Sequence, residues 1–221
     1  MNRLALAVLL SSGVCFAAES LDAVLSRMDQ GAAQFHSMSA DIRMVTHTAI
    51  LDDNTIENGT LKMQRVKNDA QALIDFTGDK DRRTIAFMNK AIQLYFPKLN
   101  LVQVYKLGKK ANLLDQYLLL GFGTSGKELV KGYAVNAAGS EQVNGKEATK
   151  LELIPKDSKV KEQLDKVEIW IPTDSGYPVQ QKFYNPSGNH RLVTYTNFQL
   201  NPSLGSLKLE TPPNAKIEYP Q

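Results

Sequence analysis

The hydrophobic pattern of the chain first predicts an amphipathic helix. Apolar residues recur at three- and four-residue spacing from Leu21 to Phe35, with polar residues such as Asp22 and Ser26 between them. This spacing places the apolar side chains on one face of a helix. Ser20 stands directly before them and can cap the helix N-terminus. We therefore expect one helix with a single buried stripe.

From Ser39 onward the hydrophobic period is two, which is typical of strands. Ala40, Ile42 and Met44 alternate with polar residues. Asn89-Lys90 fits a two-residue hairpin turn between two later strands. The pattern predicts a meander of antiparallel strands. Its further members are residues 59–66, 70–77, 83–88, 91–96 and 101–107.

An almost wholly apolar stretch interrupts the alternation and predicts a second helix. It extends from Leu113 to Leu120 and is closed by Gly121, and residues 125–131 can add one more helical turn. Period-two stretches then return, so the predicted fold has two main helices and many antiparallel strands. The later strands are residues 133–137, 148–155, 167–171, 179–184 and 191–200.

One face of these strands is lined with apolar side chains, and a sheet must bury such a face against another layer of structure. We expect the sheet to curve over the two helices, and incomplete filling would leave a dry cavity for an apolar ligand. The alternative is that the same side chains fill a solid core, because periodicity does not distinguish a packed face from a lined pocket. The candidate cavity residues are Met44, Leu61, Met63, Ile74, Phe76, Ile85, Phe87, Leu94, Phe96, Trp170 and Phe183.

The first 17 residues have the pattern of a secretory signal peptide, with Arg3, a short apolar core and small residues at the end. The apolar run is shorter than the ~20 residues that span a bilayer. Cleavage after Ala17, or after Ala18, would leave a single domain of residues 18–221. The alternative interpretation is a short buried helix. The residues before Cys15 fit a lipid-anchor signal poorly, so we expect a soluble periplasmic protein.

Composition narrows the possible functions. The 221 residues are 43% hydrophobic and 22% charged, with a formal net charge of +3. These values are normal for a globular domain and too weakly basic to indicate a nucleic-acid partner. There is one cysteine and there are three histidines, and no metal-binding or hydrolase motif is present. We therefore expect a monomeric binding protein without catalysis, cofactor or metal.

One motif favours nucleotide chemistry. Gly121–Lys127 nearly matches a phosphate-binding loop, which requires a strand before the glycines and a helix after them. Here a predicted helix precedes the glycines, and Glu128 stands where such loops need a Ser or Thr for magnesium. We expect a glycine-rich loop that ends a helix, with nucleotide binding as the alternative.

Four segments carry a family resemblance: Phe35–Asp41, Asn58–Arg65, Thr84–Phe96 and Leu207–Ile217. They resemble the LolA-like family of periplasmic outer-membrane lipoprotein carriers. Phe35–Asp41 resembles the family's passage from helix to first strand, and Asn58–Arg65 resembles its second strand. Thr84–Phe96 is similar to its aromatic hairpin, and Leu207–Ile217, with a double proline, is similar to its closing strand. The resemblance implies an α+β fold: an open, unclosed antiparallel β-barrel with a helical lid, as in LolA and LolB.

The resemblance also implies a function. Such a carrier, a transport chaperone, shelters the acyl chains of lipoproteins on the way to the outer membrane. Its partners are an inner-membrane release complex and an outer-membrane acceptor. The implied lid residues are Leu113, Leu114, Tyr117 and Leu118, with Arg65 as a basic residue that can bond to the lid. Relatives with this fold bind other lipids or sense lipoproteins, so a periplasmic lipid-binding or lipoprotein-sensing module is the alternative. Trp170 is the single tryptophan, whereas familiar carriers have more aromatic residues on the inner face.

Overall fold

The computed structural model describes residues 19–67, 69–79, 82–108 and 117–220. The predicted signal peptide and two of the predicted lid residues, Leu113 and Leu114, therefore lie outside the described residues. In this part of the chain, the helical segments with defined bounds are α1 (Leu21–Gln34), η1 (Pro97–Leu99), α3 (Gly126–Gly132) and α4 (Ser158–Lys161). The strands are β1 (Ser37–Thr48), β2 (Asp53–Val66), β3 (Asp69–Phe76), β4 (Arg83–Met88), β5 (Ala91–Phe96), β6 (Leu101–Lys106), β7 (Tyr133–Val143), β8 (Lys146–Pro155), β9 (Lys166–Pro172), β10 (Gln180–Tyr184), β11 (His190–Leu200) and β12 (Lys216–Glu218).

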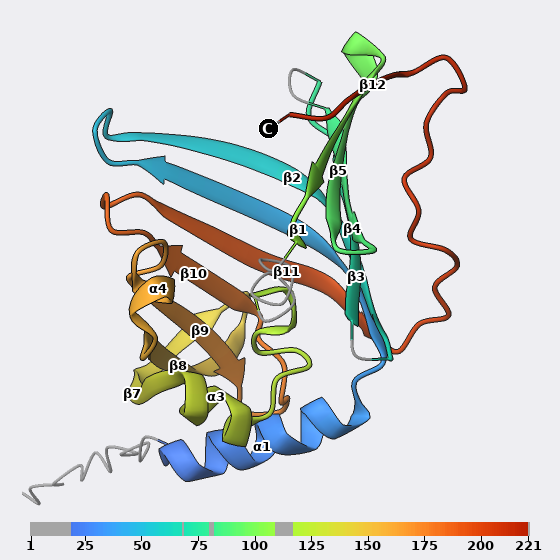
Figure 1. The fold of residues 1–221 in the computed structure, drawn as a ribbon. Coiled ribbons are helices and arrows are strands. Elements are labelled where there is room, and N and C mark those ends of the chain that lie inside the picture. Colours follow the sequence, from blue (N-terminus) through green and yellow to red (C-terminus); the bar gives the residue numbers. More distant parts are fainter. Residues whose placement is uncertain (1–18, 68, 80–81, 109–116, 221) are drawn as a thin grey trace, which may run out of the picture.

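Within the described residues, these strands form one sheet in the order β12-β6-β5-β4-β3-β2-β1-β11-β10-β9-β8-β7. The pairs are antiparallel except for β12 and β6, which are parallel. The two edge strands, β7 and β12, are not paired with each other, so the sheet bends strongly but stays open (Figure 1). The predicted fold class, an open antiparallel β-barrel with helical elements, is confirmed.

Local sequence signals account for the boundaries of several elements. The Ser20 hydroxyl accepts a hydrogen bond from the Ala23 backbone N–H at 3.3 Å and caps α1 as expected. Asn89 and Lys90 have positive φ angles of 53° and 58°, as a tight hairpin turn with the twist of the strands requires. Ser125 and Glu128 form a capping box that starts α3.

The helices α1 and α3 cover one half of the concave side of the sheet. Val24 and Met28 of α1 and Leu129 of α3 are buried against inward-facing residues of β8 and β9, such as Leu153 and Ile169. Gly126 permits this packing, because a Cβ atom there would lie 2.6 Å from the carbonyl oxygen of Leu25. This half of the concave side is therefore a solid core.

The C-terminal segment differs from the expected closing strand. Only Lys216–Glu218 forms a strand, β12, whereas residues 202–215 run as an irregular segment along the outside of the molecule (Figure 1). Pro212 and Pro213 keep their own positions out of a strand ladder, since proline lacks the N–H group that such a ladder needs. Leu207 is buried, so the segment is nevertheless packed against the domain.

Candidate functional site

The other half of the concave side is an apolar surface built by strand register. One row across the sheet consists of Met38, Met63, Ala72, Phe87, Ile92 and Tyr105. The next row consists of Ala40, Leu61, Ile74, Ile85, Leu94 and Gln103. Because side chains alternate between the two faces of a sheet, all members of these rows point to the same face. We call this surface, formed by β1–β6, the concave apolar face.

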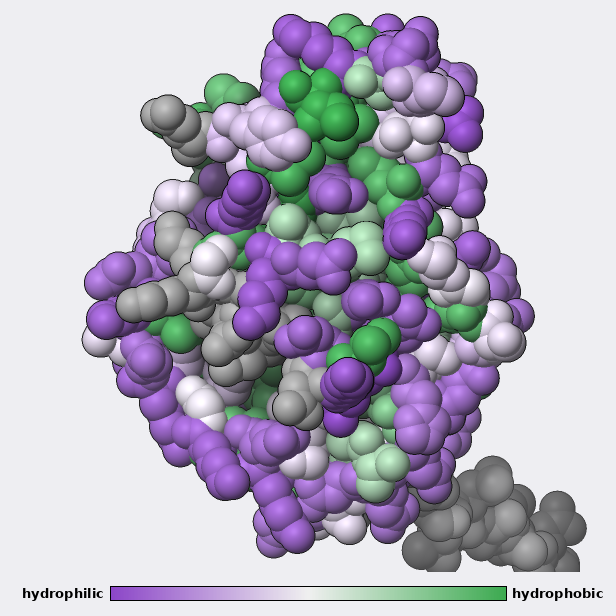
Figure 2. All heavy atoms as spheres, turned by 45° about the vertical axis from the view of Figure 1, so that its right-hand side comes forward, coloured by the Kyte–Doolittle hydropathy of each residue, from purple (hydrophilic) through white to green (hydrophobic). Residues whose placement is uncertain are grey.

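Burial changes across the concave apolar face. Leu61, Met63, Phe76 and Phe87 are buried in one cluster, to which Met44 also belongs. Ile74 and Ile85 pack against that cluster but are only half-buried, and Leu94 and Phe96 on β5 are also half-buried. Figure 2 shows hydrophobic surface reaching the outside between polar residues. The face is thus closed near β1 and β2 and partly uncovered toward β5.

A half-buried ion pair limits the concave apolar face at one end. Arg83 and Glu57 form a bidentate ion pair. The Arg83 side chain is 20% exposed and the Glu57 side chain is 17% exposed. The Arg83 guanidinium also lies over the Phe76 ring, 4.2 Å from its centre. The pair neutralises its own charges, so the apolar surface ends in a polar group with little net charge.

Two of the predicted lid residues can be placed. Residues 117–119 are helical, and Leu118 packs against the cluster of the concave apolar face. Tyr117 instead packs against the core under α1 and α3. Its hydroxyl is buried and has no hydrogen-bond partner among the described residues, and this burial raises the pKa of Tyr117. Burial of the Tyr133 hydroxyl, together with the nearby Tyr117, raises the pKa of Tyr133 to about 12.

Arg65 lies where it can hold the segment that follows the predicted lid. Its Nη2 donates a hydrogen bond to the backbone oxygen of Gly123 at 2.5 Å. A Cβ atom on Gly123 would lie 2.5 Å from the same nitrogen, so the guanidinium needs a glycine at this position. The resemblance-based expectation about Arg65 thus corresponds to a contact in the structure.

Sequence reasoning missed a second anchor of this segment. The Nε2 of Gln181 donates to the backbone oxygen of Leu120 at 2.8 Å, and the Tyr195 hydroxyl donates to Oε1 of Gln181 at 2.5 Å. All three residues are buried, and burial raises the pKa of Tyr195. A glutamine at an inward-facing strand position was the signal in the sequence, because buried polar groups need partners.

The glycines of the nucleotide-like motif have structural roles. Gly121 adopts a positive φ of 77°, Gly123 lies against Arg65, and Gly126 lies against α1. A helical turn precedes them, as expected, and a strand does not. Each glycine is therefore explained by backbone conformation or close packing, and nothing in this arrangement favours a phosphate ligand.

Two predicted cavity residues lie elsewhere. Trp170 points to the opposite face of the sheet from Ile169 and Ile171, in a separate cluster with Val143 and Ala148. The prediction for Trp170 is wrong in its placement, because adjacent strand residues face opposite sides. Phe183 does face inward, but it packs against the core under α1 and α3 and lines a pocket of about 250 Å³ with Thr46, Leu164 and Arg191.

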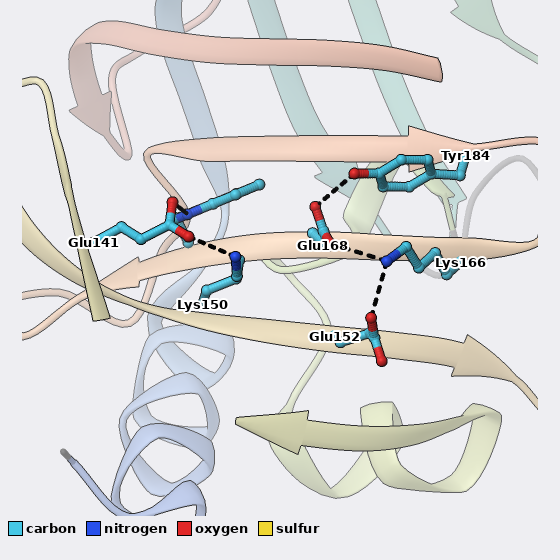
Figure 3. Close-up of polar contacts among 7 residues, drawn as sticks. Glu141, Lys150, Glu152, Lys166, Glu168 and Tyr184 are labelled. Carbon is cyan, nitrogen blue, oxygen red and sulfur yellow. Dashed lines mark hydrogen bonds and ion pairs between the residues drawn. The ribbon is translucent and has the colours of Figure 1, made fainter. Parts of the chain in front are cut away.

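The outer face around Trp170 carries a charged network (Figure 3). The Trp170 indole N–H donates to Glu141, which also pairs with Lys150 at 2.5 Å. Nearby, Lys166 pairs with Glu152 at 2.9 Å and with Glu168 at 3.1 Å, and the Tyr184 hydroxyl donates to Glu168 at 2.8 Å. Each charged group of the network has a partner of opposite charge, and the contacts link β7, β8, β9 and β10 on the outer face.

We expect Glu168 to make this network sensitive to acid. Burial opposes the charged form, but hydrogen bonds from Tyr184 and Lys166 prevail and lower the pKa of Glu168. A lowered folded-state pKa adds stability above the unfolded-state pKa, and that stability is lost as the pH falls through the folded-state pKa. Urea unfolding at pH 7 and pH 3 should therefore show a larger loss for the wild type than for Glu168→Gln. Equal losses in the two proteins would contradict this assignment.

Among the described residues, no three His, Cys, Asp or Glu side chains are grouped to hold a metal ion. In the same part of the chain, no helix combines the length and the apolar character needed to cross a membrane.

Comparisons with known proteins concern mainly the fold. A family model described as an uncharacterized protein matches residues 68–201, and no curated protein matches the sequence. An uncharacterized conserved protein from Thermus thermophilus is similar in structure, with 11% identity, a TM-score of 0.54, and coverage of 91% of this chain and 100% of that one. MucB, known in complex with MucA from Pseudomonas aeruginosa, has 15% identity, a TM-score of 0.52, and coverage of 89% and 65%.

A LolA superfamily protein from Nitrosomonas europaea is also similar, with 13% identity, a TM-score of 0.40, and coverage of 84% of this chain and 95% of that one.

Proposed function

The chain belongs to the family whose model matches residues 68–201, and we propose that it is a non-catalytic periplasmic carrier that binds the acyl chains of lipoproteins. The observation that supports this most directly is the concave apolar face, whose half-buried Ile74, Ile85, Leu94 and Phe96 are held on a rigid sheet. Each acyl CH₂ removed from water contributes about 0.8 kcal/mol. A surface of this kind can therefore hold acyl chains without any bond-breaking step.

We further propose that the segment at residues 113–120 is a lid over this face. Leu118 already packs on the face, and Arg65 and Gln181 fix the end of the segment through Gly123 and Leu120. Release of the cargo would then need only an acceptor that holds the acyl chains better, such as an outer-membrane partner.

A second candidate function is a lipid-binding or lipoprotein-sensing module of the same shape. The fold similarity to MucB, a protein known in complex with another protein, supports keeping this candidate.

Native mass spectrometry of the protein purified from its own host tests both functions. A bound lipopeptide or lipoprotein supports the carrier, and a bound diacyl lipid without peptide supports the module. If neither is bound, and if the purified protein also fails to take up a synthetic triacylated peptide while remaining folded, the lipid-binding proposal is wrong.

A further inference from the structure

The tip of the β1–β2 hairpin presents two adjacent aliphatic side chains to solvent. Ile50 is 90% exposed and Leu51 is 72% exposed. A single exposed apolar residue is ordinary on a protein surface. Adjacent apolar side chains that project together are typical of an interaction site. Neither side chain belongs to a hydrophobic cluster of the described residues, so neither stabilises the fold by packing.

The tip is an ordered turn. The Leu51 backbone N–H donates to the oxygen of Thr48 at 3.1 Å, and the Asp52 N–H donates to the oxygen of Ala49 at 3.3 Å. The Ala49 N–H donates to Oδ1 of Asn189 in the β10–β11 turn at 2.8 Å. The two aliphatic side chains are therefore held out on a braced backbone, which lowers the entropy lost when they bind.

The position of the tip points to a large, flat partner. β2 pairs with β3 only from Gly59 onward, so Asp53–Asn58 extends the hairpin beyond that neighbour. The tip lies at the end of β1 opposite to α1, about 36 Å away at the usual rise of a strand. Figure 1 shows the hairpin projecting from the domain on the side away from α1.

We propose that Ile50 and Leu51 insert into the interfacial layer of a lipid bilayer and dock this end of the protein on a membrane. Aliphatic side chains on a projecting turn suit the boundary between headgroups and acyl chains. Asp52 and Asp53 follow them directly, so the contact does not depend on attraction to anionic lipids. This inference rests on the proposed function for its purpose, since docking would bring the carrier to the layer where acyl chains are exchanged.

Flotation with vesicles tests the inference on the mature chain. The wild type should float with vesicles of phosphatidylcholine alone, and added phosphatidylglycerol should not strengthen the binding. Ile50→Asp/Leu51→Asp should weaken it by about ten-fold or more, since each aliphatic group loses its transfer into the apolar layer. Val130→Asp is the matched control, because Val130 is a 37% exposed aliphatic residue on α3, away from the tip. It should float like the wild type.

Three results would overturn the inference: no flotation of the wild type, equal flotation of the tip variant, or flotation that requires phosphatidylglycerol. Thermal unfolding of the tip variant should match the wild type, because the Ile50 and Leu51 side chains belong to no hydrophobic cluster of the described residues. Uptake of a triacylated peptide in the absence of vesicles separates this inference from the proposed function. The tip variant should keep that uptake, whereas a variant of the concave apolar face should lose it and still float.

Discussion

Leu94→Glu should lower the affinity for an acylated peptide by up to about 500-fold at pH 7. Leu94 is half-buried on the concave apolar face, between Ile85 on β4 and Gln103 on β6. A carboxylate there must either stay charged against acyl chains or become protonated. Protonation of a carboxyl with pKa ~4.3 at pH 7 costs about 3.7 kcal/mol, which sets the upper limit of the loss.

Gln93→Glu is the control for this variant, because Gln93 is the neighbouring residue on the opposite face of β5. It adds the same charge to the same strand and should change the affinity less than about two-fold. Titration of each variant with a fluorescent acylated peptide measures the effect, and the affinity of Leu94→Glu should partly recover at pH 4. Equal losses in both variants would show that the concave apolar face is not the binding surface.

Gln181→Leu should destabilise the fold by about 3 kcal/mol. The side-chain amide joins the backbone oxygen of Leu120 to the hydroxyl of Tyr195, and leucine has nearly the same volume but no polar atom. The substitution leaves a buried carbonyl and a buried hydroxyl without these partners, and each such loss costs about 1–3 kcal/mol. Urea unfolding measures the effect as a lower midpoint with an unchanged slope.

Two further variants make this prediction specific. Gln180→Leu changes the adjacent, half-buried glutamine, whose partner is the Thr194 hydroxyl, and should cost less than about 1 kcal/mol. Gln181→Leu/Tyr195→Phe removes both the Gln181 amide and the Tyr195 hydroxyl that it would leave unpaired. This double variant should recover part of the stability lost in Gln181→Leu. If the double variant is as unstable as the sum of the single ones, the two side chains do not act as a unit.

The local parts of the fold could be predicted because they depend on neighbouring residues. The α1 stripe, the Ser20 cap and the Asn89-Lys90 turn need only a few consecutive residues, and the structure contains each of them. The face of Trp170 could also have been found, since the alternation through Ile169 and Ile171 already places it outward. The cavity prediction for Trp170 rests on its apolar character and not on its position in the alternation.

The anchors of the predicted lid could not be found in this way. Arg65 and Gly123 are 58 residues apart, and Gln181 and Leu120 are 61 residues apart. Such contacts require that β2 and β10 both lie beneath the segment that contains Leu120 and Gly123. No local sequence pattern specifies that arrangement. Alternation along the strand predicts that Phe183 faces inward. It does not predict that Phe183 packs against the core under α1 and α3.

Most of the elements and the apolar face of most strands follow from local sequence patterns, because turn residues and alternation act over a few neighbouring positions. Which half of that face is filled and which half stays partly uncovered is a property of the tertiary structure. The two helices, α1 and α3, cover β8 and β9, whereas β5 keeps half-buried apolar residues. The physical reason is that burial depends on which distant segments pack on a face, and a period of two carries no information about them.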